Sequence, residues 1–502
     1  MIIPLPQRAL TRTVAIAAAI GGAGIALQYA RLGLTLTHYD ARGHLIVARR
    51  IFDRITPGWQ QIGAVWLPLP HLLNALPVQI DALYRTGASA VAISVASFAM
   101  ACACIAWITD RLTQSAMTAV AATAVFALNP NVLYLQSTPM TEPLLLALVL
   151  LSVVLVMRWS TGEATSARAV GWTLALACLT RYEAWPVVAS ALAIGAILAW
   201  RTWSFSEAAR RTVRIAIYPA AAIVAFTMFS RIVVGSWFAD DFFVPENPAQ
   251  GRPFEALSEI VWGARTLSGA LLVGTAVTGM IWLLWRGGKD RGLSWLPLTL
   301  LTTAAVPWVA FLGGHPYRIR YMVPLMAIEA ACAGAAVAIL PRRFRPVGAV
   351  ALLVLVCVEL RPLDANAPMI AEARWDRPNI IERDATVTPC LARDYDGTSI
   401  MASMGSLGHY MQDLSRAGFD LRDFLHEGNG DIWLSALQHP APFAGWMLIE
   451  EKAEGGDMLA RIAREKPAFL EEFSRVCDGA GLALYRRHPA GVAPGHHLSP
   501  VD

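Results

Sequence analysis

Charged residues are scarce in this chain. Only 16% of its 502 residues are charged and 56% are hydrophobic, and the mean hydropathy is +0.47. A soluble domain carries roughly 25% charged residues, so the composition excludes an ordinary water-soluble protein and indicates a membrane protein. The formal net charge of +4 is small for this length. We therefore expect no nucleic-acid partner.

Cysteine is scarce too, with seven in the chain. Most of them lie in apolar runs and are interpreted as small apolar fillers: Cys102, Cys104, Cys178, Cys332 and Cys357. Cys390 and Cys477 lie outside these runs. In an oxidising compartment such an even pair favours a disulfide, and the alternative is two buried free thiols.

The chain has no convincing internal repeat, but apolar runs long enough to cross a bilayer recur along most of it. We expect about eleven membrane-spanning helices, near 12–31, 86–108, 115–128, 141–157, 170–182, 184–200, 214–232, 263–285, 293–312, 321–340 and 347–360. Arginines concentrate in the loops on the N-terminal side of this arrangement, so the positive-inside rule places the N-terminus in the cytoplasm and the C-terminus outside. A cleaved signal peptide is the alternative for the first run.

The sequence predicts three regions. Residues 1–360 form a membrane domain whose long first outer loop, 32–85, contains the arginine-edged stretch ARGHLIVARRIFDRI and a Trp- and Pro-rich stretch. We expect two interfacial helices in this loop. Residues 361–490 alternate β-like runs (SIMASM, GWMLIEE, LALYRR) with helical ones, which predicts a small soluble α/β domain on the outer face. The Pro/Gly/His-rich tail 491–502 is expected to be disordered.

The stretch LTHYDARGHLIVARRIFD, residues 36–53, places Asp40 where the first span ends. An ionisable side chain there is costly unless it is hydrated, paired or used, and a carboxylate in this position can accept a proton from a hydroxyl nucleophile. Alternatively, Asp40 caps the helix that follows, because Asp is a preferred N-cap residue. His44 is a candidate ligand or proton carrier, and a structural hydrogen-bond donor is its alternative.

Three charged residues lie at the outer ends of later spans. Glu142 in PMTEPLLL begins a span, where an acid either favours the helix N-terminus or contributes to acceptor or metal binding. Arg181 and Glu183 in LTRYEAWP interrupt nearly continuous apolar sequence. They either neutralise each other at the membrane edge or take part in function.

The motif HPYRIRY places Arg318, Arg320 and Tyr321 at another outer end. Guanidinium groups bind phosphate bidentately and stay charged at any relevant pH, so the arginines are candidate phosphate ligands. Interfacial anchoring by Tyr and Arg is the alternative. Trp66 and His71, in the first outer loop, are interpreted as supports of the interfacial segment.

Under the predicted topology all these groups lie on one outer face. Together they resemble the pattern of the GT-C superfamily of membrane glycosyltransferases, which includes protein O-mannosyltransferases and the aminoarabinose and rhizobial lipopolysaccharide sugar transferases. The resemblance rests on an acid in the first outer loop (HYDARGHLIVARR), a Pro/Glu-started span (STPMTEPLLL), the arginine of LTRYEAW, and RIRYMVP at a late span. It covers about 30–330 as architecture, with weak local motifs, and the outer α/β domain completes it.

The resemblance implies a bacterial cell-envelope enzyme of the cytoplasmic (inner) membrane. Such an enzyme moves a sugar, with inversion, from a polyprenyl-phosphate donor to a hydroxyl on a glycan, lipid or protein acceptor. By the same resemblance Asp40 is the general base, and Arg181, Arg318 and Arg320, together with Tyr321, bind the donor phosphate.

One position departs from the family pattern. Many members carry two adjacent acids in the first loop, whereas Ala41 follows Asp40 in this chain. The role of the second acid is therefore unfilled or passes to Glu142, Glu183 or His44, and a divalent cation stays open as a cofactor.

Two other classes of protein remain as alternatives. A transporter or flippase for a lipid-linked glycan predicts charges deep within spans and a repeat that relates two halves. A non-catalytic envelope assembly protein predicts that Asp40→Asn leaves function intact.

Overall fold

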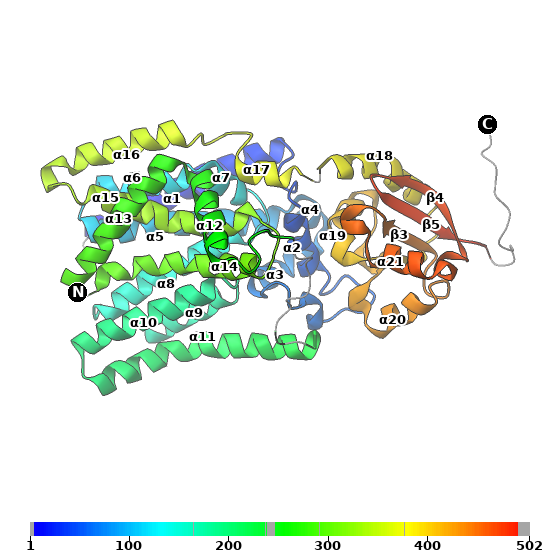
Figure 1. Ribbon diagram of the computed structural model, residues 1–502, viewed down its shortest axis with the longest axis horizontal. Helices are drawn as coiled ribbons and strands as arrows, with labels where there is room; N and C mark the ends of the chain where they lie inside the picture. Colours follow the sequence, from blue (N-terminus) through cyan, green and yellow to red (C-terminus); the bar gives the residue numbers. More distant parts are fainter. Residues whose placement is uncertain are drawn as a thin grey trace. The chain divides into compact units, whose positions relative to one another are not determined.

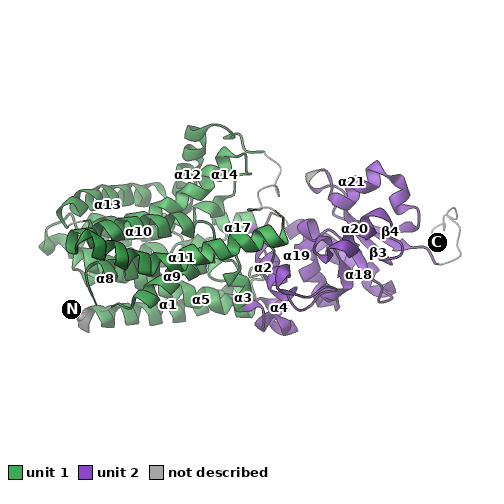
Figure 2. Cartoon of the chain, turned by 90° about the horizontal axis from the view of Figure 1, so that it is seen from below, with its two compact units in different colours: residues 1–35, 63–73, 88–372 green, residues 36–62, 74–87, 373–502 purple. Residues whose placement is uncertain are grey.

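The computed structural model describes residues 5–163, 165–235, 237, 246–290, 292–375 and 377–489. The chain forms two compact units (Figure 2). Unit 1 comprises 1–35, 63–73 and 88–372, and unit 2 comprises 36–62, 74–87 and 373–502. Unit 2 therefore joins most of the predicted first loop to the C-terminal segment, an association that the sequence did not predict. The predicted disordered tail, 491–502, lies outside the described residues.

Unit 1 is a bundle of helices (Figure 1). Its α-helices are α1 (Leu5–Arg31), α3 (Leu69–Asn74), α5 (Ala88–Thr113), α6 (Ala116–Ala127), α7 (Pro130–Leu135), α8 (Glu142–Ser160), α9 (Ala167–Cys178), α10 (Ala184–Thr202), α11 (Phe205–Val233), α12 (Pro253–Ser268), α13 (Ala270–Lys289), α14 (Ala305–Leu312), α15 (Leu325–Val337), α16 (Arg345–Glu359) and α17 (Pro368–Ala373). Short 3-10 helices complete it: η3 (Leu293–Trp295), η4 (Pro297–Ala304), η5 (Ile319–Met322) and η6 (Arg342–Phe344).

These helices follow the apolar runs of the sequence, because a helix satisfies its own backbone hydrogen bonds inside lipid. Seven helices of the described chain are long and apolar enough to cross a membrane, or up to eight if the bent pair α15 and α16 is one span. The chain is thus a multi-pass membrane protein. The count of eleven spans stays a prediction, since the helices at two of the predicted positions, α6 and α9, are shorter apolar helices.

The outer surface of unit 1 is apolar where lipid is expected. Helix α11 exposes Val213, Ile217, Val224 and Ile232, and helix α3 exposes Leu72 and Leu73. In water such a continuous apolar surface would promote association. In a bilayer it is the surface that contacts the acyl chains.

Unit 2 combines short helices with one sheet. Its helices are α2 (Tyr39–Arg49), α4 (Asp81–Thr86), α18 (Arg377–Asp394), α19 (Met404–Leu414), α20 (Asp431–Gln438) and α21 (Met458–Glu465). Its 3-10 helices are η1 (Trp59–Ile62), η2 (Pro77–Gln79), η7 (Ser415–Ala417), η8 (Leu421–Asp423), η9 (Glu427–Asn429), η10 (Ala453–Gly455) and η11 (Pro467–Leu470). Its strands are β1 (Ile400–Ala402), β2 (Phe424–Leu425), β3 (Trp446–Glu450), β4 (Phe473–Gly479) and β5 (Leu482–Arg487).

The five strands form a mixed sheet in the order β2-β1-β3-β5-β4. Strand β1 is parallel to β2 and β3, with Ile400 opposite Trp446, while β5 is antiparallel to β3 and β4. Strands β1 and β3 are buried along their whole length, which is why SIMASM and GWMLIEE have continuous apolar runs. Strand β4 was not predicted because its burial pattern is mostly exposed.

The arginine side of helix α2 is buried against acids that are distant in the sequence. Arg42 and Arg49, on the expected polar side, are 8% and 5% exposed. Both arginines form ion pairs with acids of the C-terminal segment. Acids distant in the sequence therefore cover the polar side of α2, and the position of this helix at the membrane interface stays a prediction.

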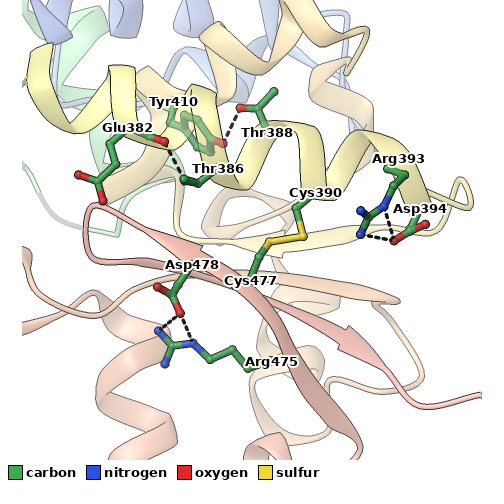
Figure 3. The surroundings of a disulfide bond; sticks show 10 residues. All are labelled: Glu382, Thr386, Thr388, Cys390, Arg393, Asp394, Tyr410, Arg475, Cys477 and Asp478. Carbon is green, nitrogen blue, oxygen red and sulfur yellow. Dashed lines mark hydrogen bonds and ion pairs between the residues drawn. A yellow bond between two sulfur atoms is a disulfide. The ribbon is translucent and has the colours of Figure 1, made fainter. Parts of the chain in front are cut away.

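A disulfide joins α18 to the sheet of unit 2. Cys390 on α18 is bonded to Cys477 on β4 (Figure 3), with their Cα atoms 6.7 Å apart. The bond closes a segment of chain across a sequence separation of 87. It therefore restricts the unfolded chain between the first helix and the edge strand of the C-terminal segment.

Removing this disulfide with Cys390→Ala and Cys477→Ala is expected to destabilise unit 2 by roughly 4.6 kcal/mol, the loop-closure value for a segment of this length. Proteolysis of the full-length protein in membranes measures the effect as faster cleavage within unit 2. Cys357→Ala, which removes an exposed free cysteine on α16, is the control. Equal cleavage rates for the double variant and the control would contradict the prediction.

Candidate active site

In unit 1, Arg181 lies in the turn between α9 and α10 and binds two carboxylates. Its Nη1 donates to Glu142 Oε1 over 3.0 Å, and its Nη2 donates to Glu183 Oε1 over 2.6 Å. Nη1 also donates to Thr141 Oγ1 over 3.1 Å. Glu142 begins α8 and is fully buried. The guanidinium therefore ties the start of α8 to the start of α10.

The two acids keep Arg181 charged. Burial lowers its pKa, but Glu142, Glu183 and then Tyr321 more than reverse this effect, so the pKa lies above its ordinary value. Because two carboxylates already neutralise the guanidinium, its attraction for a further anion is weak. The contacts thus favour the alternative in which Arg181 and Glu183 neutralise each other, with Glu142 as a third member.

Arg320 and Tyr321 lie in η5 beside this triad. Arg320 is buried, and its Cζ lies 5.3 Å from the centroid of the Tyr321 ring. The Tyr321 hydroxyl is hydrogen-bonded to His315 Nε2 over 3.3 Å and is close enough to Arg181 to raise its pKa. Arg318, immediately before η5, is partly exposed. The structure therefore brings the RIRY motif and the RYE motif together.

The Trp- and Pro-rich part of the first loop supports the same region. The rings of Trp66 and His71 are stacked, with centroids 5.9 Å apart, and His71 is buried. Two hydrogen bonds join this segment to the α9–α10 turn: Leu69 N donates to Leu179 O over 2.9 Å, and Tyr182 Oη donates to Ala64 O over 3.2 Å. Trp66 and His71 thus lie in a segment fixed to the turn that carries Arg181.

In unit 2, Asp40 lies in the first turn of α2. His38 is the N-cap of this helix, because its Nδ1 accepts a hydrogen bond from the backbone N–H of Asp40 over 3.1 Å. The alternative in which Asp40 itself is the cap is therefore wrong. Asp40 is 5% exposed, and so is His44, which lies one turn later on the same helix face. A buried acid and a buried imidazole thus share one face of α2.

Ion pairs within unit 2 fix both ends of α2. Near its start, Arg42 pairs with Asp413 over 3.1 Å and its Nε donates to Leu36 O over 2.7 Å. At its end, Arg49 pairs with Asp53 over 2.7 Å and also with Asp81 and Asp420. The sequence signal for this arrangement is weak, since only Arg49 and Asp53 have the local i,i+4 spacing.

Two further arginines of unit 2, the buried Arg54 and the partly buried Arg50, have no carboxylate in hydrogen-bond contact among the described residues. Arg50 Nε donates to Gln61 O over 2.6 Å, and Arg54 donates to Gln61 Oε1 and, over 3.3 Å, to His426 Nδ1. Burial lowers the pKa of Arg50 to about 10, and burial together with the charge of Arg50 lowers the pKa of Arg54 to about 9. Burial, followed by the charges of Arg54 and Arg50, holds the pKa of His426 well below its usual value. This cluster was missed by the sequence reading.

The described residues do not form a candidate metal centre. Among them, no group of three or more His, Cys, Asp or Glu side chains lies close enough to hold a metal ion. Asp40 and His44 lie on one helix face, but they are only two side chains of the kinds that bind metal ions, and no third lies close enough among the described residues. We therefore assign no chemical step to a divalent cation.

The fold is shared with known membrane proteins, although no family model and no curated protein matches the sequence. The crystal structure of ArnT from Cupriavidus metallidurans bound to undecaprenyl phosphate aligns over 95% of this chain and 99% of that chain, with a TM-score of 0.56 and 11% identity. The apo structure of the same protein aligns over 94% and 98%, with a TM-score of 0.55 and 12% identity. The likeness establishes the fold of the chain, which is that of ArnT.

Replacing Arg181 tests whether it holds the two acids. Arg181→Met leaves Glu142 and Glu183 buried without a cation, so we expect a loss of about 3–5 kcal/mol in stability, measured as thermal unfolding of the protein in detergent micelles. Adding Glu142→Gln and Glu183→Gln should restore part of it. The control is Arg210→Met, which removes an exposed arginine paired with Glu207. If Arg181→Met unfolds at the same temperature as the wild type, Arg181 does not stabilise the protein by holding the two acids.

The buried His426 predicts a pH dependence for unit 2. Its pKa is lowered in the folded state, so below about pH 6.5 the unfolded chain binds a proton that the folded chain does not, and stability falls as pH falls. We expect a slope of up to about 1.4 kcal/mol per pH unit, which His426→Gln removes. Hydrogen exchange of the sheet amides in the full-length protein, between pH 7 and pH 5, measures it; identical slopes in both proteins would exclude His426 as the cause.

Proposed function

We propose that this chain is an inverting glycosyltransferase that moves a sugar from a polyprenyl-phosphate donor to a hydroxyl acceptor at the outer face of the cytoplasmic membrane. The observation that carries the proposal is Asp40, a buried carboxylate on a helix fixed at both ends. The fold likeness to ArnT, whose structure contains undecaprenyl phosphate, supports a lipid-linked substrate.

Asp40 acts as the general base in a single displacement. Its carboxylate takes the proton from the acceptor hydroxyl while that oxygen attacks the anomeric carbon of the sugar. The bond between the anomeric carbon and the phosphate oxygen breaks, and the electron pair leaves with the polyprenyl phosphate. Attack opposite to the leaving group inverts the anomeric configuration.

Arg318 and Arg320 bind the departing phosphate. Their guanidinium groups belong to one short segment, in which Arg320 lies over the ring of Tyr321. A guanidinium that meets the developing charge of the leaving phosphate stabilises the transition state more than the ground state. Arg181 has a different role in this proposal, because its guanidinium is already paired with the carboxylates of Glu142 and Glu183. It positions the helix starts next to the phosphate ligands.

His44 is the candidate for the place of the second acid. Ala41 supplies no side-chain donor or acceptor, and Glu142 is already paired with Arg181. His44 shares a helix face with Asp40, so it can orient the carboxylate or the acceptor hydroxyl. The segment 404–429, which supplies Asp413 to Arg42, shapes the acceptor side.

Transfer from a panel of polyprenyl-phosphate sugars to membrane acceptors tests the function. In Asp40→Asn we expect turnover to fall by about 10²–10⁴, the usual contribution of a general base, while the affinity for the donor stays close to wild type. Sugar transfer and donor binding are measured separately on the full-length protein in nanodiscs.

The matched control is Asp478→Asn, which removes an exposed carboxylate of unit 2 from its pair with Arg475. It should transfer at the wild-type rate. Transfer by Asp40→Asn at the control's rate would refute the mechanism, and failure of every donor sugar with the wild type would refute the function.

A further inference from the structure

A basic cavity lies at the end of unit 1 that is opposite Glu142 and Arg181. Its volume is about 320 Å³ and its walls are formed by Gln114, Ser115, Arg342, Arg345 and Pro346. Glu142 begins α8, and Arg158 lies in the last turn of the same helix. Arg158 forms an ion pair with Glu163, which also pairs with Arg111 near the end of α5. Because Gln114 directly follows α5, the cavity belongs to this second end. The N-terminus of α1 lies at the same end (Figure 1).

The charge at the cavity is not neutralised by an acid. Arg345 is held by three backbone carbonyls: it donates to Thr113 O, to Leu340 O over 3.3 Å and to Ala338 O over 3.3 Å. Among the described residues, neither Arg345 nor Arg342 forms an ion pair with a carboxylate. Three acids at this end have their own partners: Glu163 lies between two arginines, Asp290 lies 3.7 Å from Arg286, and Glu207 pairs with Arg210 and Arg211. Asp110, near the end of α5, does not line the cavity. Backbone carbonyls are uncharged, so hydrogen bonds to them orient a guanidinium without neutralising its positive charge, which can still attract an anion.

Two helix starts add to this charge. The N-cap of α6, Ser115, and the first residues of α16, Arg345 and Pro346, all line the cavity. The helices have 12 and 15 residues, and each presents the positive end of its dipole here. A pair of guanidiniums and two helix starts around one hollow form an environment for a phosphate group.

The surface next to the cavity indicates that the phosphate belongs to a lipid. From its start at the cavity, α16 exposes one apolar stripe: Val347, Val350, Val354 and Val358. These positions recur at spacings of three and four, so they lie on one face of the helix. A lipid whose headgroup fills the cavity can lay its acyl chains along this face.

We propose that the cavity between the α5–α6 turn and the α15–α16 turn binds the phosphate headgroup of an anionic glycerophospholipid. Basic pockets between spanning helices bind such headgroups when they lie at headgroup depth. The site is separate from the proposed glycosyl transfer, and Asp40→Asn should leave it unchanged.

The test uses the full-length protein in detergent micelles, titrated with phosphatidylglycerol and, separately, with phosphatidylcholine and inorganic phosphate, with bound lipid counted by native mass spectrometry. We expect phosphatidylglycerol to bind more tightly than both other probes. Each arginine near a lipid phosphate contributes about fivefold in affinity, so Arg342→Gln with Arg345→Gln should weaken binding roughly 25-fold.

Single variants distinguish the loss of a phosphate ligand from a general folding defect. Arg342→Gln changes an exposed side chain and should weaken phosphatidylglycerol binding about fivefold, whereas Arg345→Lys keeps the charge and should bind nearly as the wild type does. The control, Arg210→Gln with Arg211→Gln, removes two arginines that are paired with Glu207 and should have no effect. Equal binding of phosphatidylcholine, equally tight binding of inorganic phosphate, or an equal loss in the control would each overturn the proposal.

Discussion

The pairing of Arg49 with three acids is the interaction on which unit 2 depends. Its guanidinium lies 2.7 Å from Asp53, 2.7 Å from Asp81 and 3.1 Å from Asp420, and its Cζ lies 4.5 Å from the ring centroid of Tyr84. The acids come from three separate stretches of the unit. A buried cation without them would be very costly, so the folding of the first loop and that of the C-terminal segment are coupled through this residue.

Arginine has three different roles in this chain, and its partners distinguish them. Arg49 and Arg181 are surrounded by carboxylates and hold segments together. Arg54 is buried and Arg50 partly buried, with amide, carbonyl and imidazole partners. Burial lowers the pKa of both, and the charge of Arg50 lowers that of Arg54 further. Arg345 is oriented by carbonyls alone at the edge of a cavity. Since a guanidinium is charged in all three settings, the charges around it decide whether an anion can approach.

The sequence predicted those features that depend on local pattern. Apolar runs predicted the long helices because lipid enforces helical hydrogen bonding, and short β-like runs predicted β1, β3 and β5. It could not predict that α2 would be covered, because the partners of its arginines, Asp413 and Asp420, lie more than 300 residues further along the chain. Glu329, a buried acid on α15 that accepts a hydrogen bond from Ser268, was missed, although an acid within the predicted span 321–340 is itself a signal. In the candidate site, the RYE and RIRY motifs were recognised singly, whereas their proximity depends on the tertiary fold.

The precision that a general base requires follows from how α2 is held. A catalytic carboxylate must stay within a fraction of an ångström of its productive position, and a side chain on a free interfacial helix would not satisfy this. Here His38 caps the first turn, Arg42 fixes the start to Asp413, and Arg49 fixes the last turn. Asp40 lies between these anchors on a helix that cannot tilt without breaking buried ion pairs. The ion pairs that cover the arginine side of α2 are therefore also the ones that would hold Asp40 in place for its proposed role as a base.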